Sequence, residues 1–137
     1  MAESDPRRVL GAAGERLART HLEARGLTVL DANFRTRHGE LDIVAADRRC
    51  LVFCEVKTRI ARAERGTEGG SGLGGELGPF GAIGPRKQRK LRLLAREWLA
   101  EHGADAPWRP ELRFDAVGVE LDRQGRLLRI DHLEGAF

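Results

Sequence analysis

The amino-acid sequence predicts an α/β fold, in which helices flank a central mixed sheet as in a layered sandwich. Two long stretches carry apolar residues at the spacing of amphipathic helices. Short runs of β-branched and aliphatic residues lie between these stretches and after the second one, as is typical of strands. The order along the chain is therefore helix, three strands, a glycine-rich loop, helix and two strands.

Length and composition indicate one globular domain that spans residues 1–137. Of the 137 residues, 41% are hydrophobic and 33% are charged, which is enough chain to form one hydrophobic core. The formal net charge of +3 permits a polyanionic partner without requiring one. No apolar run is long enough to cross a membrane, and the N-terminus has no hydrophobic signal core. We therefore expect a cytoplasmic protein without membrane contact.

The two cysteines, Cys50 and Cys54, do not suit a disulfide or a zinc site. In an extended segment they lie roughly 13 Å apart, which is too far for a disulfide. No second cysteine pair supplies the usual zinc spacing. We interpret them as small buried residues in a reducing compartment.

The first predicted helix begins at Pro6, after Ser4 or Asp5 as N-cap, and runs to about Arg25 before Gly26. Its apolar stripe comprises Leu10, Ala13, Leu17, His21 and Leu22.

Two polar residues of this helix need separate interpretation. Glu15 lies at the edge of the stripe, so it either reaches a site at the rim of the core or is an ordinary solvated glutamate; the pattern leaves both open. His21 lies on the stripe, and we expect a half-buried side chain with a hydrogen-bond partner rather than a ligand.

Three strands are expected next. Leu27–Leu30 is a short candidate, followed by a polar connection over Asp31–His38. Leu41–Ala45 and Leu51–Val56 then flank a turn at Ala46–Arg49, which predicts a β-hairpin. The cations of the polar connection either contact phosphate or belong to a solvated loop.

Three charged residues interrupt this apolar hairpin: Asp42, Glu55 and Lys57. Burying a single charge is costly, so charges in apolar strands are normally paired or bound to a metal. Glu55 and Lys57 are two residues apart and therefore point to the same face of a strand. The pattern predicts a divalent-metal site beside a phosphate.

The segment from Ile60 to Gly84 has a different composition. Nine of the 17 glycines lie between Gly66 and Gly84, and such a segment cannot offset its ordering entropy by burial. We expect a mobile loop over residues 60–84 that orders on a ligand. A P-loop is excluded because the Lys-Ser or Lys-Thr ending is missing.

The second predicted helix starts at Gly84-Pro85 and runs to about His102, with Gly103 beyond it. Its inner stripe comprises Lys87, Leu91, Leu94, Ala95, Trp98 and Leu99. Its first two turns carry Arg86, Lys87, Arg89, Lys90 and Arg92. Cations are unfavourable at this end of a helix dipole. An anion site explains them, and a solvated basic face is the alternative.

Two further strands are expected at Leu112–Leu121 and Leu127–Leu133, joined by a turn at Asp122–Gly125. Asp115 is a lone acid in the first of these strands. We expect it to anchor a loop or an arginine rather than a metal.

In combination, these motifs resemble the PD-(D/E)XK nuclease superfamily and, in more detail, the UPF0102 (YraN-like) family of small bacterial proteins. The matching residues are Gly14-Glu15, Asn33, Gly39-Glu40-Leu41-Asp42, Phe53-Cys54-Glu55-Val56-Lys57-Thr58-Arg59, Lys87-Gln88 and Arg113-Phe114-Asp115. The resemblance implies a restriction-endonuclease-like three-layer sandwich. The nearest functional relatives that it implies are archaeal Holliday-junction resolvases, which also carry a helix glutamate followed by arginine, here Glu15-Arg16.

Three features depart from these patterns. The superfamily's proline-aspartate is Leu41-Asp42 here, which keeps the aspartate ligand. The glycine-rich segment is longer than is usual in such proteins. The chain has no tyrosine, which excludes the Gln-x-x-x-Tyr signature of many RecB-like exonucleases for Gln88.

The resemblance and the charge pattern imply the same roles. Glu15, Asp42, Glu55 and Lys57 are the expected catalytic residues. Asp42, Glu55 and the carbonyl of Val56 are the expected ligands of Mg²⁺ or Mn²⁺. The expected nucleic-acid-binding residues are Arg16, Arg35, Arg59, Arg86, Lys87, Gln88 and Lys90.

These roles predict a metal-dependent nuclease that hydrolyses phosphodiester bonds in DNA, with branched, Holliday-junction-like DNA as one candidate substrate. Two alternatives remain open. One is a catalytically silent module on the same fold that binds nucleic acid or a partner protein. The other is a structural domain whose inward charges pair with each other. A resolvase acts on two equivalent strands and is expected to be a symmetric homodimer, through a sheet edge or the Trp108 region.

Overall fold

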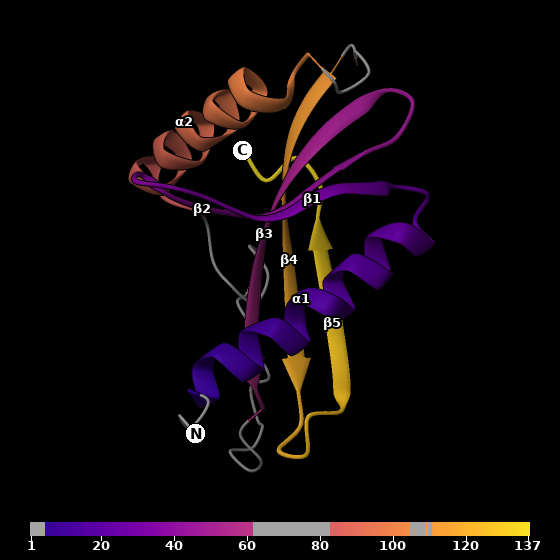
Figure 1. Cartoon of the computed structure of the whole chain (residues 1–137). Coiled ribbons are helices and arrows are strands. Elements are labelled where there is room, and N and C mark those ends of the chain that lie inside the picture. The colour runs from indigo at the N-terminus through magenta and orange to yellow at the C-terminus, as the bar shows by residue number, and fades with distance from the viewer. Residues whose placement is uncertain (1–4, 62–82, 105–108, 110) are drawn as a thin grey trace.

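The computed structural model describes residues 5–61, 83–104, 109 and 111–137 (Figure 1). The elements in these residues follow the predicted order. They are α1 (Pro6–Ala24), β1 (Thr28–Thr36), β2 (Gly39–Ala46), β3 (Cys50–Ile60), α2 (Pro85–His102), β4 (Glu111–Leu121) and β5 (Leu127–Leu133). None of these helices is long and apolar enough to span a membrane.

The described strands form one sheet in the order β1-β2-β3-β4-β5. The pairs β1–β2, β2–β3 and β4–β5 are antiparallel. β3 and β4 are parallel and pair from Cys50↔Glu111 to Ile60↔Leu121. Parallel neighbours need a long crossover, and α2 lies within that crossover. The predicted mixed sheet is therefore confirmed.

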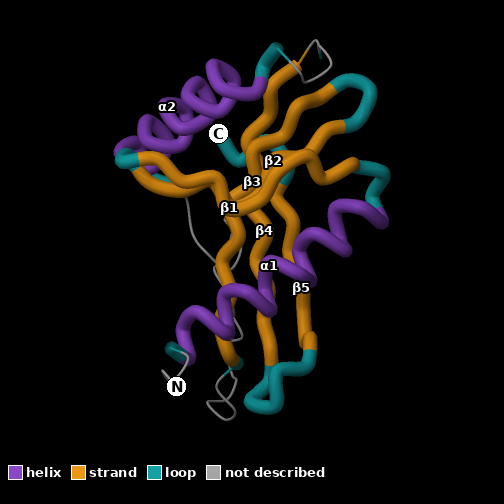
Figure 2. Tube along the Cα trace, viewed as in Figure 1, coloured by secondary structure: helices purple, strands orange, loops and turns teal. Residues whose placement is uncertain are grey.

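The two helices pack on opposite faces of the sheet (Figure 2). Successive residues of β3 alternate between the two cores, as strand geometry requires. Val52 and Cys54 pack with Leu22 of α1, whereas Leu51 and Phe53 pack with Trp98 of α2. The fold is thus a three-layer sandwich.

The cysteines fit this burial pattern. Cys50 and Cys54 are both buried and free, which confirms the interpretation as small core residues.

The predicted boundary of the first strand was wrong. β1 is not limited to Leu27–Leu30 but runs from Thr28 to Thr36, through most of the segment predicted as a polar connection. β1 lies at one edge of the sheet, and Phe34 is its one buried residue. Except for Leu30, its exposed positions are polar, so the sequence lacks the apolar run on which the strand prediction depended.

Part of the glycine-rich segment lies outside the described residues. Residues 62–82 are among these, so the predicted mobile loop over 60–84 stays a prediction there. At its start, Ile60 still belongs to β3.

α1 crosses β3 at very short range. A Cβ built on Gly14 overlaps the side chain of Thr58, so only glycine permits this approach. The close crossing brings the next residue, Glu15, to the end of β2.

Candidate metal centre at a fork in the sheet

β2 and β3 separate halfway along their length and create a fork. They pair only from Ala46↔Leu51 to Ile43↔Cys54. Beyond Ile43, β2 follows β1 as far as Gly39, while β3 follows β4 as far as Ile60 (Figure 1).

Asp42 lies where the strands part. Its Oδ2 accepts a hydrogen bond of 2.8 Å from the backbone N–H of Val56. The carboxylate therefore takes the place of a strand partner at the fork. β2 also bends here, because Leu41 and Ile43 pack into opposite cores although they are two residues apart.

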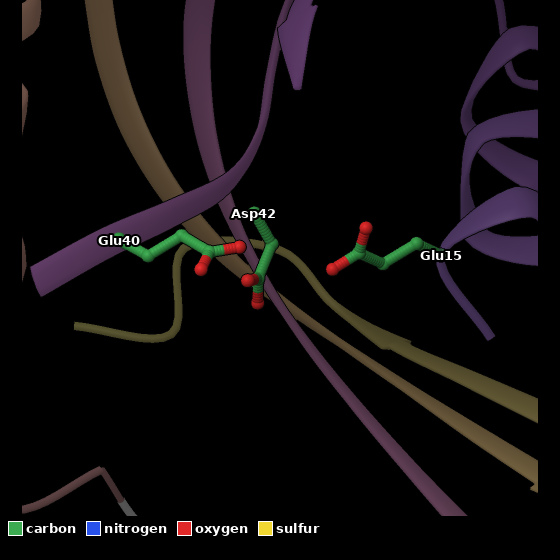
Figure 3. Close-up of side chains that lie close together, drawn as sticks. All are labelled: Glu15, Glu40 and Asp42. Carbon is green, nitrogen blue, oxygen red and sulfur yellow. The ribbon is translucent and has the colours of Figure 1, made fainter. Parts of the chain in front are cut away.

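Three carboxylates converge at this fork: those of Glu15 from α1 and of Glu40 and Asp42 from β2. Each offers an oxygen within 4.8 Å of the others, and all three side chains are half-buried. Figure 3 shows the Glu15 and Glu40 side chains extending from opposite sides toward Asp42.

This arrangement disfavours the charged state of two of the carboxylates. Burial raises the pKa of Asp42 to about 7, with further contributions from the charges of Glu55, Glu15 and Glu40, although the Val56 N–H opposes the shift. Burial also raises the pKa of Glu15. Both pKa shifts arise mainly from burial, and the neighbouring acids add to the shift of Asp42.

Asn33 holds Glu15 in this position. The Asn33 side chain is hydrogen-bonded to the Glu15 carboxylate, which opposes the rise in the Glu15 pKa. Asn33 lies on β1 between the pairs Ala32↔Ile43 and Phe34↔Leu41, and so across from Asp42. Its φ of 55° is in the left-handed region, which asparagine tolerates better than most residues.

α2 fixes the tip of the β1–β2 hairpin, and with it the position of Glu40. Glu97 of α2 accepts a hydrogen bond of 3.0 Å from the Thr36 hydroxyl and lies 3.1 Å from Nδ1 of His38. Gly39 has a φ of 140°, and a Cβ there would lie 2.7 Å from Cε of Lys90. Glycine therefore allows the tip to pack directly against the helix.

Glu55 is near the three carboxylates but has a partner of its own. Its charge contributes to the raised pKa of Asp42, while its Oε1 lies 3.1 Å from Nζ of Lys87. The structure thus places Glu55 beside Asp42 and pairs it with a cation from α2.

Lys57 is exposed and lines a pocket of about 230 Å³ between α1 and β3. Glu15 and Val56 also line this pocket. All four predicted catalytic residues therefore lie around the fork.

Glu40 was not predicted as a site residue. A signal was present, because Glu40 and Asp42 are two residues apart on one strand and two acids at that spacing share a face.

Of the predicted nucleic-acid-binding residues, all are exposed except Gln88, which is half-buried. Four of them also contact the protein itself: Arg35 Nε lies 2.9 Å from Glu40 Oε2, Arg59 Nε lies 3.4 Å from Glu120 Oε2, Lys87 contacts Glu55, and Gln88 donates to the Ile83 carbonyl at 2.7 Å.

Asp115 lies outside the fork and is fully paired. Arg113 donates to both of its oxygens at 2.8 and 2.9 Å, and Gly135 N–H donates at 3.0 Å. His132 Nε2 lies 2.8 Å from Oδ2, and its Nδ1 lies 3.0 Å from Nε2 of His21. The predicted arginine anchor and the predicted half-buried His21 are both confirmed.

Comparison with known proteins assigns the chain to a family. Residues 14–119 match the profile described as "Uncharacterised protein family UPF0102". The chain belongs to the UPF0102 family.

Several bacterial UPF0102 proteins are similar over nearly the whole chain. The UPF0102 protein of Parafrankia sp. (strain EAN1pec) is 45% identical over 129 residues, covering 93% of this chain and 95% of that protein. That of Acidothermus cellulolyticus is 42% identical over 138 residues, covering 96% and 95%. That of Mycobacterium avium (strain 104) is 46% identical over 128 residues, covering 92% and 88%.

The UPF0102 match contains the whole fork. It begins at Gly14, next to Glu15, and extends past β3 and α2 into β4. These names assign the family but no activity, so function depends on the chemistry of the fork.

Proposed function

We propose that this UPF0102 protein is a metal-dependent nuclease that hydrolyses phosphodiester bonds in DNA. One observation carries the proposal: Glu15, Glu40 and Asp42 bring carboxylate oxygens within 4.8 Å of one another, with Glu55 and Lys57 at the same fork. A half-buried group of acids is unfavourable without a cation, and Asp42 reflects this cost in its raised pKa.

The donor atoms fit Mg²⁺ or Mn²⁺. The site offers carboxylate oxygens, which hard divalent cations prefer, whereas structural zinc sites use mainly cysteine and histidine. Asp42 is central, because it contacts β3 through Val56 N–H and neighbours every other acid of the fork. Glu15, Glu40 and Glu55 are the further candidate ligands.

The chain's own residues then divide the remaining tasks. When bound, the metal would lower the pKa of a water molecule and neutralise charge on the scissile phosphate. Lys57, which lines the pocket beside Glu15, would stabilise the charge that develops on the phosphate or orient the attacking water. Glu15, held by Asn33, would accept a hydrogen bond from that water.

The basic start of α2 supports a nucleic-acid substrate. Arg86, Lys87 and Lys90 occupy the end of the helix where backbone amides and the dipole also attract phosphate. We propose DNA rather than RNA, and branched DNA as the first structure to test. A symmetric homodimer would present one site to each equivalent strand of a junction. The expected compartment is the cytoplasm.

A cleavage assay tests this proposal. Purified protein with Mn²⁺ is given an end-labelled four-way junction, a flap, a linear duplex and a single strand. We expect cleavage of at least one substrate, lost in Asp42→Asn and Glu55→Ala. Glu23→Gln is a matched control, because Glu23 is also an acid on α1 but, unlike the half-buried Glu15, is exposed and lies eight residues further along the helix.

Two outcomes would contradict the nuclease. Salt-sensitive DNA binding without cleavage in any metal would favour a catalytically silent binding module. Cleavage that persists in both Asp42→Asn and Glu55→Ala would mean that the activity comes from elsewhere.

A further inference from the structure

Two of the fork's acids are already paired with cations from the predicted nucleic-acid-binding set. Arg35 Nε lies 2.9 Å from Glu40 Oε2, and Lys87 Nζ lies 3.1 Å from Glu55 Oε1. The acids flank Asp42 from two directions, since Glu40 is on β2 and Glu55 is on β3. The same two cations therefore have two competing anionic partners: the fork's carboxylates and a DNA phosphate.

Exposure decides which member of each pair can be reached from solution. The Arg35 side chain is 72% exposed and that of Glu40 29%; the Lys87 side chain is 48% exposed and that of Glu55 21%. The carboxylates thus face the fork, while the cations remain open to solvent. A phosphate can approach either cation without entering the site.

The charges balance in an exchange. Arg35 and Lys87 together supply two positive charges, which is the charge of one Mg²⁺ or Mn²⁺ ion. An ion that binds at the fork neutralises carboxylates that these cations otherwise neutralise. Exposed ion pairs are weak, typically less than about 1 kcal/mol, so such pairs separate readily.

We propose that Arg35 and Lys87 are exchangeable counterions that couple metal binding to DNA binding. Without metal they neutralise Glu40 and Glu55. A bound divalent cation replaces them there and releases both to contact DNA phosphates. Because coupling between two ligands is reciprocal, DNA that draws these cations away also strengthens metal binding. This inference rests on the proposed metal site. It adds a role for Arg35 and Lys87 as counterions that neither the family description nor the nuclease proposal contains.

The first test measures metal affinity without DNA. Mn²⁺ binding is followed by the EPR signal of the free ion in wild-type protein and in Arg35→Met and Lys87→Met. Methionine keeps most of the side-chain length and removes the charge. We expect Mn²⁺ to bind about 2- to 5-fold more tightly in each variant, because a competing cation is gone. Arg129→Met is the matched control, since Arg129 pairs with Asp131 on β5, and its Mn²⁺ affinity should equal that of the wild type.

The second test measures DNA affinity with Ca²⁺, chosen as a divalent probe for binding rather than cleavage. Ca²⁺ should strengthen DNA binding by the wild type and steepen its salt dependence. The slope of log K against log salt concentration should change by roughly 1.8, which corresponds to two further phosphate contacts. About half of that change should remain in either single variant and none in the double variant. A structural role for the ion pairs predicts no such pattern.

The outcomes separate this inference from the nuclease proposal. Mn²⁺ binding that is unchanged or weaker in both variants would overturn the exchange and leave the metal site intact. An equal Ca²⁺ effect in the wild type and the double variant would do the same. Failure of the wild type to bind Mn²⁺ at all would overturn both proposals.

Discussion

Asp42 and Asp115 are alike in sequence and opposite in environment. Each is an aspartate with apolar residues on both sides in its strand. Asp115 is completely buried, and the hydrogen bonds from His132, Arg113 and Gly135 N–H outweigh the effect of burial and keep its pKa below the ordinary value. Burial and neighbouring acids instead raise the pKa of Asp42 to about 7. The difference shows that the partners, rather than the strand, decide whether a buried acid stabilises the fold or is available for chemistry.

Removal of Asp115 is expected to have the largest effect on stability. Asp115→Ala leaves Arg113 and His132 without their shared partner, and breaking a buried ion pair costs roughly 3–5 kcal/mol. Urea unfolding measures the change in free energy. Asp131→Ala, which removes a partly exposed acid paired with Arg129, should cost less than about 1 kcal/mol. Equal losses in the two variants would mean that the Asp115 network contributes little.

Neutralising Asp42 should have the opposite sign. Asp42→Asn keeps an oxygen that can accept from Val56 N–H and removes a charge that the fork disfavours. We expect the metal-free protein to gain roughly 1–3 kcal/mol at pH 8, since a pKa difference of one corresponds to about 1.4 kcal/mol. Unfolding in EDTA measures this gain, and Glu23→Gln should leave stability unchanged. A loss of stability would place Asp42 in the same class as Asp115.

Asp42 and Asp115 should also change the stability of the protein in different pH ranges and with opposite sign. The raised pKa of Asp42 means that the folded state holds its proton more tightly than the unfolded state, so stability falls as pH rises from 3.8 to about 7. The lowered pKa of Asp115 gives stability that is lost as pH falls below 3.8. Unfolding across this range in EDTA should show a smaller first decline in Asp42→Asn than in the wild type, because among the described acids only Glu15, whose pKa is also raised, then remains to contribute to it.

Substitution of Asn33 should have the smallest effect on stability. Two substitutions there separate the effect of the backbone conformation from that of the side chain. Asn33→Gly tolerates the φ of 55° and removes the contact with Glu15, whereas Asn33→Ala also introduces strain. We expect Asn33→Ala to lower the free energy of unfolding by about 1 kcal/mol more than Asn33→Gly does. Both variants should weaken Mn²⁺ binding equally. A normal Mn²⁺ affinity in both would exclude a positioning role for Asn33.

Much of the fold could be predicted because local signals and packing agree. α2 was predicted from Pro85 to His102 by its proline start and apolar stripe, and β5 by its apolar run. β1 was mistaken because an edge strand buries little, so Asp31, Asn33 and Arg35 made it look like a loop. The sheet pairing that holds it comes from β2, which local pattern does not reveal.

The candidate site was predictable in composition but not in pairing. Asp42, Glu55 and Lys57 stood out as charges in apolar runs. Glu15 was ambiguous, because helical spacing places it at the edge of a stripe but does not say what lies opposite. That Glu40 joins Asp42 while Glu55 meets Lys87 depends on the divergence of β2 from β3 and on the crossover through α2. Both are long-range features that sequence spacing does not encode.

The absence of a side chain at Gly14 has a consequence for how finely the fork is adjusted. α1 contacts Thr58 of β3 directly at Gly14, with no methyl group between them. The distance between α1 and β3 therefore determines how closely the Glu15 carboxylate approaches Asp42. One added carbon at position 14 would increase the distance between α1 and β3 and move Glu15 away from Asp42, although every acid would still be present. The selectivity of the fork between ions of different radius would then depend on the missing Cβ of Gly14.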